Sequence, residues 1–234
     1  MLNGKGTLAL VGSGEFLPLS QNLDQALLAT LKEPPRVVVL PTASAPDGLG
    51  VAERWGKMGV DYFKGLGAQA EAVMVLSRQD ASSSELAQRI ASANLVYLSG
   101  GKPSYLVKTL RETLCWQAIR TVFEQGGVVA GCSAGAMALA GYLPGFGPGK
   151  PQPALGLAPK LVVIPHFDEI PKWLNGLFKY STKRQRLTVV GVEGSTGLVG
   201  TGTIQTWQVV GRGGVTVFSP QGRKRYTNGE TIIL

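Results

Sequence analysis

One segment of the sequence has residue types and a spacing that suit nucleophilic catalysis. Val128 to Ala130 is typical of a buried strand, the run Gly-Cys-Ser-Ala-Gly at residues 131–135 follows it, and small residues then favour a helix. Small residues permit the sharp turn that exposes a serine hydroxyl, and the N-terminus of the next helix directs backbone N–H groups toward an oxyanion. We therefore predict Ser133 as a nucleophile and expect Cys132 to pack inward. A tight packing turn is the alternative interpretation.

A serine nucleophile needs a base, and the chain contains a single histidine, His166. This residue follows the apolar run Val162 to Pro165 and so stands at the C-terminal end of a predicted strand. A lone histidine is often only structural. Because it follows a strand in a chain that also contains the turn at Ser133, we predict that His166 is the base.

The acid that orients this base must lie downstream of it. Between Ser133 and His166 the sequence has no Asp or Glu, which excludes the serine, acid, histidine order of α/β-hydrolases. Glu193 is the favoured acid, because it follows the predicted strand Val189 to Val192 and precedes a glycine. Asp168 is the main alternative, since it lies two residues after the histidine. The other downstream acids are Glu169 and Glu230.

An oxyanion hole needs a second donor besides the N–H of Ala134. Leu95 to Leu98 is typical of a strand, and it ends in a serine and two glycines. Glycine lets the backbone approach a substrate closely, so we expect the N–H of Gly101 to be this donor, with Gly100 beside it at the substrate. A turn with a purely conformational role is the alternative.

Predicted strands and helices alternate through the first part of the chain and would position these residues. The strands are expected at Thr7–Val11, Arg36–Leu40, Ala72–Leu76, Leu95–Leu98 and Val128–Ala130, and the helices at Leu23–Leu31, Val51–Gly65, Ser84–Ala93, Ser104–Thr113 and Trp116–Glu124. Continuously apolar strands are buried on both faces, which predicts a mostly parallel sheet between helical layers. Functional residues are then expected at the carboxyl ends of the strands.

The second part of the chain has a different pattern. Gly141 to Pro159 is rich in glycine and proline, which predicts a long loop. After it we expect a strand at Leu161–Ile164, an amphipathic helix at Pro171–Leu187, and short strands from Val189 onward with turns at Gly211–Gly214 and Asn228–Gly229. We therefore expect one α/β domain over residues 1–234 with a β-rich C-terminal section.

Composition limits the other kinds of site. One His and two Cys exclude a multi-histidine metal cage, an all-cysteine zinc site and a disulfide framework, and we expect no metal or organic cofactor. The net charge of +8 suits an acidic substrate. Because the positive residues are scattered, we expect neither nucleic acid nor a membrane as a partner. With no long apolar stretch and no signal-peptide pattern, the chain is expected to be soluble and cytoplasmic.

Five motifs, taken in order, resemble the S51 serine peptidases, a family that includes peptidase E and cyanophycinase. They are Gly100-Gly101 after a strand, the turn at residues 131–136, Pro165-His166-Phe167, the basic run at residues 182–187, and Gly191-Val192-Glu193-Gly194. The resemblance runs from about Thr7 to the C-terminus. It implies a class I glutamine amidotransferase-like fold, which is flavodoxin-like: a three-layer α/β/α sandwich.

The resemblance also implies roles for individual residues. Ser133 matches the nucleophile, His166 the base, Gly101 and Ala134 the oxyanion donors, and Glu193 the acid of the cyanophycinase branch. Lys183, Arg184 and Arg186 fall where the family places arginines near substrate carboxylates, which agrees with the planar cationic partners that an acidic substrate prefers.

The family cleaves after aspartate, so the resemblance implies hydrolysis of a peptide or isopeptide bond after an aspartyl residue in a small acidic peptide. A monomer or homodimer is expected. The chain departs from the family in four places. It lacks the aspartate that peptidase E has between serine and histidine, and it has Lys102 where Asn is common. Where cyanophycinase has Asp-Gln before the histidine and a close run of arginines after it, this chain has Ile164-Pro165 and the run Asp-Glu-Ile-Pro at residues 168–171. The alternative function is a catalytically altered domain that binds a small acidic ligand or a protein partner.

Overall fold

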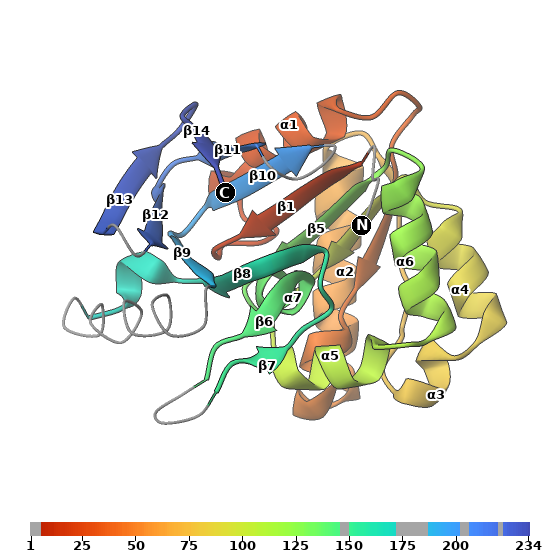
Figure 1. Ribbon diagram of the computed structural model, residues 1–234. Helices are drawn as coiled ribbons and strands as arrows, with labels where there is room; N and C mark the ends of the chain where they lie inside the picture. Colours follow the sequence, from red (N-terminus) through yellow and green to blue (C-terminus); the bar gives the residue numbers. More distant parts are fainter. Residues whose placement is uncertain (1–5, 146–149, 172–186, 202–205, 220–221) are drawn as a thin grey trace.

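The computed structural model describes residues 6–145, 150–171, 187–201, 206–219 and 222–234, and places their strands in two sheets (Figure 1). The first sheet has the order β14-β11-β10-β1-β5-β4-β2-β3. Its strands are β1 (Thr7–Val11), β2 (Arg36–Leu40), β3 (Gln69–Ala72), β4 (Leu95–Leu98), β5 (Val128–Cys132), β10 (Thr196–Thr201), β11 (Thr206–Gly211) and β14 (Thr231–Ile233). From β1 to β3 all neighbours are parallel, whereas β10, β11 and β14 extend the sheet in antiparallel pairs.

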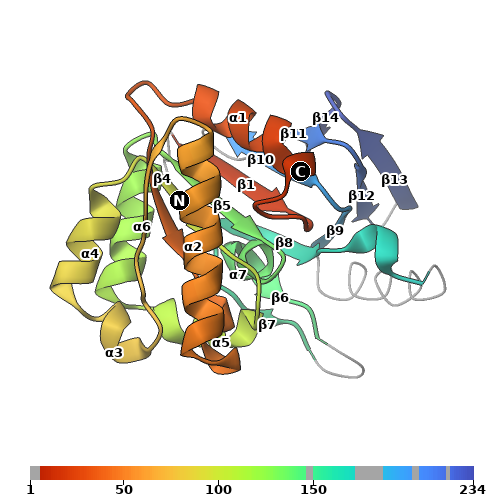
Figure 2. The ribbon, with the colours of Figure 1, turned by 180° about the vertical axis from the view of Figure 1, so that it is seen from behind.

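Helices cover both faces of this sheet, because its central strands are apolar on both sides. One face carries Ala9, Val39 and Tyr97 and packs on the helices α1 and α2, which Figure 2 shows in front of the sheet. The other face carries Leu10, Val96 and Val129 and packs on α4, α5, α6 and α7. The described α-helices are α1 (Gln21–Ala29), α2 (Leu49–Gly65), α3 (Arg78–Ala81), α4 (Ser84–Ala91), α5 (Pro103–Leu110), α6 (Leu114–Glu124) and α7 (Ala134–Leu139), and short 3₁₀ turns are η1 (Pro18–Ser20), η2 (Thr42–Asp47) and η3 (Phe167–Glu169). The predicted layered α/β class with a β-rich C-terminal section is thereby confirmed.

A second sheet, which the sequence did not predict, lies on the same side of the first sheet as α7 and packs beside that helix (Figure 1). Its order is β13-β12-β9-β8-β6-β7, with β6 (Ala140–Leu143), β7 (Gln152–Pro153), β8 (Ala158–Ile164), β9 (Thr188–Val192), β12 (Gly214–Ser219) and β13 (Gly222–Thr227). Alternate residues of β8 and β9 pack toward the main core, among them Val163 and Val190, while Val162 and Val189 form a cluster on the other face.

Two predicted boundaries were wrong. Gly141 to Pro159 is not one long loop, because parts of it form β6, β7 and the start of β8. Its strand prolines are Pro153, in the two-residue edge strand β7, and Pro159, near the start of β8 where the pairing with β6 is irregular. The strand expected at Ala72–Leu76 is β3, at Gln69–Ala72. Val73 and Val75 are fully buried, but they lie past the ladder with β2. Most of the helix expected at Pro171–Leu187 lies outside the described residues.

The core between the first sheet and α1 and α2 contains a buried carboxyl group. The side chain of Asp24 is 1% exposed, and it accepts a hydrogen bond of 2.8 Å from the hydroxyl of Tyr62 at Oδ2. Its Oδ1 has no hydrogen-bond partner within the described part of the chain. Burial raises the pKa of Asp24 to about 7. Near neutral pH this carboxyl therefore changes its charge inside the core.

Asp24→Asn should flatten part of the pH dependence of stability. The pKa of Asp24 is higher in the folded state than in the unfolded chain, where it is 3.8. Its contribution to the free energy of unfolding is therefore complete below pH 3.8 and is lost as the pH rises toward about 7. The shift corresponds to at most about 4 kcal/mol. In urea unfolding between about pH 4 and pH 8, the free energy of unfolding of the variant should increase relative to that of the wild type as the pH rises. An unfolding free-energy difference that does not vary with pH would contradict this interpretation.

Candidate active site

The predicted site residues follow the carboxyl ends of strands in both sheets. Gly100 lies two residues after β4, Ser133 directly after β5, and His166 two residues after β8. In the first sheet β5 lies between β1 and β4, whereas β8 belongs to the second sheet. The site is therefore built where the two sheets adjoin.

Ser133 occupies a strained turn between β5 and α7. Its backbone has φ 51° and ψ −111°, outside the regions that a serine ordinarily adopts. A Cβ at Gly131 would come within 2.5 Å of the backbone carbon of Gly135, and a Cβ at Gly135 within 2.2 Å of the carbonyl oxygen of Leu98. Both glycines of the Gly-x-Ser-x-Gly run are thus required for close backbone packing. Cys132 is fully buried, with its side chain directed away from solvent.

The structure brings Ser133 and His166 together. The Oγ of Ser133 lies 3.0 Å from Nε2 of His166, a hydrogen-bond distance across 33 positions of sequence. His166 also has a positive φ, 52°, in the left-handed region. When Nε2 accepts the hydroxyl proton of Ser133, Nδ1 carries the ring hydrogen. This is the arrangement in which a histidine can deprotonate a serine.

Glu169 is the acid that contacts this histidine. Its Oε1 lies 3.2 Å from Nδ1 of His166, because the short turn η3 brings the two side chains to the same side. The contact is open to solvent, with the Glu169 side chain 67% exposed and the His166 side chain 42% exposed. Glu169 can accept the Nδ1 hydrogen and so hold the orientation of the imidazole ring, although this hydrogen bond is exposed to water.

Glu193, the predicted acid, is used elsewhere. Its two carboxylate oxygens accept hydrogen bonds of 2.7 and 2.6 Å from the guanidinium of Arg225, and Oε2 also accepts the N–H of Gly214 at 2.8 Å. The hydrogen bonds from Arg225 hold the pKa of Glu193 below its usual value. The assignment of Glu193 as the orienting acid is corrected on these grounds: its carboxylate joins β9 to β12 and β13.

Asp168, the alternative acid, does not contact the histidine either. Its Oδ1 accepts the N–H of Gly194 at 2.8 Å, which ties η3 to the segment after β9. The two-residue offset placed Asp168 near His166 in sequence, but the turn directs the next residue, Glu169, to the ring. Periodicity along η3 could have indicated this, since residues three apart share one side of a turn.

The expected oxyanion donors are free of competing acceptors. Gly101 has φ 139°, and a Cβ there would lie 2.3 Å from the carbonyl oxygen of Ala43, so glycine is required. The N–H of Lys102 is bound to that same oxygen at 2.7 Å. Within the described residues, neither the N–H of Gly101 nor that of Ala134 has an acceptor in the chain. Gly100 differs, because its N–H is bound to the carboxylate of Glu15 at 2.9 Å.

The remaining predicted residues can be placed only in part. Lys183, Arg184 and Arg186 lie outside the described residues. Lys102 lies 3.3 Å from Asp47, and both side chains are largely exposed. In the part of the chain that the structure describes, no three His, Cys, Asp or Glu side chains are grouped to hold a metal ion. Among these residues there is also no helix both long and apolar enough to span a bilayer.

Comparison with known proteins identifies the family. The family model of peptidase family S51 matches residues 8–203. This chain belongs to peptidase family S51. Cyanophycinases from Synechococcus elongatus and Thermosynechococcus vestitus are each 28% identical to it over 204 residues, which is 81% of this chain and 60% of theirs. The chain thus spans less than two thirds of the length of these relatives.

Solved structures agree with the S51 assignment. The structure of a peptidase from an acI-B1 Actinobacterium has a TM-score of 0.88 and 31% identity, covering 100% of this chain and 99% of that one. A putative peptidase E from Listeria monocytogenes EGD-e has a TM-score of 0.59 and 16% identity, covering 88% of this chain and 98% of that one. The second likeness supports the fold alone.

Reaction of Ser133 with a peptidyl phosphonate should depend mainly on the histidine. Ser133→Ala should abolish labelling, and His166→Ala should slow it by about 10⁶-fold, because removal of the histidine costs about this much in a comparable triad. Glu169→Gln should slow labelling only about fivefold, since an exposed ion pair contributes about 1 kcal/mol. Labelling rates from intact-protein mass spectrometry give the comparison.

Asp168→Asn and Glu193→Gln are the matched controls, because each also replaces an acid by its amide. Asp168 is the sequence neighbour of Glu169, and Glu193 follows β9, the strand beside β8. Both should label at nearly the wild-type rate. A slower reaction in Glu193→Gln than in Glu169→Gln would return the orienting role to Glu193.

Proposed function

We propose that this S51 protein is a serine peptidase that hydrolyses a peptide or isopeptide bond after an aspartyl residue in small peptides. The observation that carries the proposal is the 3.0 Å contact between Oγ of Ser133, on its strained turn, and Nε2 of His166. A hydroxyl held against an imidazole has the parts that acyl transfer needs when two N–H groups, those of Gly101 and of Ala134 at the start of α7, have no acceptor among the described residues.

The reaction follows from this geometry. Oγ of Ser133 attacks the carbonyl carbon as its proton passes to Nε2 of His166, and the carbonyl oxygen becomes an oxyanion bound by the N–H groups of Gly101 and Ala134. The imidazolium, oriented by Glu169 at Nδ1, then gives the proton to the leaving amine. A water activated by the same histidine releases the acid product from the acyl-enzyme.

Similarity to cyanophycinases and the positive net charge of the chain support the preference for an aspartyl residue. The chain is similar to cyanophycinases and carries a net charge of +8. Lys183, Arg184 and Arg186 remain the proposed partners of the substrate carboxylate, as cationic groups suited to it.

The substrate proposal predicts turnover of aspartyl peptides only. A panel of Asp-Xaa, isoAsp-Xaa and unrelated dipeptides should show hydrolysis of one or both aspartyl series by the wild type and none by Ser133→Ala. Release of the amine product is measured by chromatography. Asp-Xaa and isoAsp-Xaa peptides of equal composition are matched, so their ratio reports the linkage.

Two results would contradict the proposal. Equal turnover of unrelated dipeptides would remove the aspartyl preference. No turnover together with no phosphonate labelling of Ser133 would favour a catalytically altered domain that binds an acidic ligand.

A further inference from the structure

A buried glutamate that the sequence did not single out lies beneath the site. Glu15 is in the segment after β1, and the residue is 8% exposed. Its Oε1 accepts the N–H of Gly100 at 2.9 Å, and its Oε2 accepts the thiol hydrogen of Cys132 at 2.9 Å. The carboxylate therefore connects the ends of three adjacent strands: β1, β5 and β4.

Both contacts of Glu15 are with direct neighbours of the reacting groups. Cys132 immediately precedes Ser133, and Gly100 immediately precedes Gly101. Burial, with the nearby Glu15 as a further cause, raises the pKa of Cys132, so the thiol keeps its hydrogen and donates it. A buried carboxylate is costly unless its oxygens are hydrogen-bonded, and each oxygen of Glu15 has one donor.

The loop at Gly100 is shaped around this carboxylate. A Cβ at Gly100 would lie 2.6 Å from Oε1 of Glu15, but 3.5 Å from Cβ of Ser133, an ordinary contact distance. The N–H of Lys102, on the other side of Gly101, is bound to Ala43. The backbone from Gly100 to Lys102 is thus held at both ends by hydrogen bonds. Of its three N–H groups, only that of Gly101 has no acceptor among the described residues.

Glu15 is itself held firmly. The next residue, Phe16, is buried with φ 61°, and its ring lies 5.2 Å from that of Tyr97 on β4. The carbonyl of Gly14 accepts the hydroxyl of Ser20 at 2.7 Å, and the carbonyl of Ser13 accepts the N–H of Ser195 at 3.0 Å. Because the segment around Glu15 is fixed in this way, its carboxylate can hold the Gly100 backbone in place.

We propose that Glu15 is a positioning residue, whose carboxylate fixes the Gly100–Gly101 backbone so that the N–H of Gly101 is directed at the oxyanion formed on attack by Ser133. The inference rests on the proposed serine hydrolase chemistry. It assigns no contact between Glu15 and the substrate: the carboxylate acts through the hydrogen bond to Gly100.

A double-mutant cycle tests this role. Glu15→Ala and Gly100→Ala should each lower kcat by about 10- to 100-fold with KM nearly unchanged, because misplacing a transition-state donor leaves ground-state binding intact. The two losses should not add, since Glu15→Ala removes the oxygen with which the new methyl group would collide. Glu15→Gln keeps an oxygen acceptor for Gly100 and should recover most of the activity.

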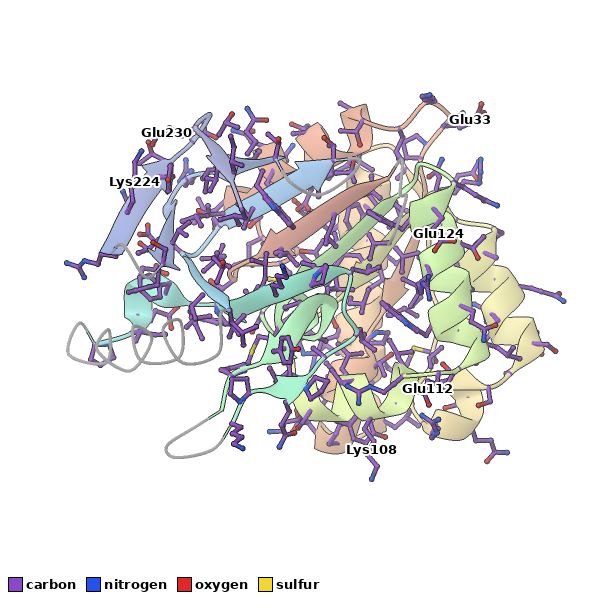
Figure 3. The ribbon with its side chains drawn as sticks, in the orientation of Figure 1. Glu33, Lys108, Glu112, Glu124, Lys224 and Glu230 are labelled. Atoms are coloured by element: carbon purple, nitrogen blue, oxygen red, sulfur yellow. The ribbon has the colours of Figure 1, made fainter. Side chains whose placement is uncertain are left out.

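The control variant is Glu33→Ala, which removes an exposed glutamate that Figure 3 shows at the upper right of the molecule, far from α7 and β8. Melting temperatures show whether each variant is folded, and if Glu15→Ala is not, Glu15→Gln and Gly100→Ala carry the comparison. Unchanged kcat in Glu15→Ala, additive losses in the cycle, or a Glu15→Gln as impaired as Glu15→Ala would overturn the proposal.

The same variants are also compared by the rate of Ser133 phosphonate labelling, which needs no peptide substrate. The phosphonyl oxygen occupies the oxyanion position, so the order of the variants should be the same. A wild type that labels but hydrolyses no peptide would refute the proposed substrate while leaving the role of Glu15 testable.

Discussion

The site depends on backbone packed closely against backbone at the end of β5. Gly131 and Gly135 leave no room for a Cβ, so α7 presses against the last residue of β4. A serine at φ 51° and ψ −111° costs about 1–3 kcal/mol, and only surroundings that fit it tightly can hold it there. This packing sends Oγ of Ser133 out of the sheet and leaves the N–H of Ala134 at the same end, so nucleophile and donor come from a single constraint.

Strain recurs in the residues that surround this turn. Phe16, His166 and Ser195 also have positive φ values, and they follow β1, β8 and β9. Each tightens the chain where it leaves a strand, and together with Ser133 they bring segments of two sheets to one place. The histidine comes from the second sheet, and the segments after β1 and β4, on either side of β5, carry Glu15 and the two glycines.

The sequence carried enough information for the fold and for the contact between Ser133 and His166. Apolar runs marked β1, β2 and β4 to the residue, since strands buried on both faces are continuous in sequence. The second sheet was not foreseen, because its pairing joins segments far apart and its edge hairpin is made of glycine and proline. Glu193 was misassigned because strand-end position does not reveal a competing cation: Arg225 lies 32 positions away.

Glu15 was missed for a related reason. Candidate acids were sought only downstream of His166, although an acid in the segment after β1, the strand beside β5, is itself a candidate site residue. Its burial also separates it from Glu169, which is 67% exposed at the side chain. Charge interactions in water are worth little, whereas buried hydrogen bonds to a carboxylate are strong. The two buried hydrogen bonds of Glu15 should therefore contribute more to the order of the site than the exposed contact between Glu169 and His166 does.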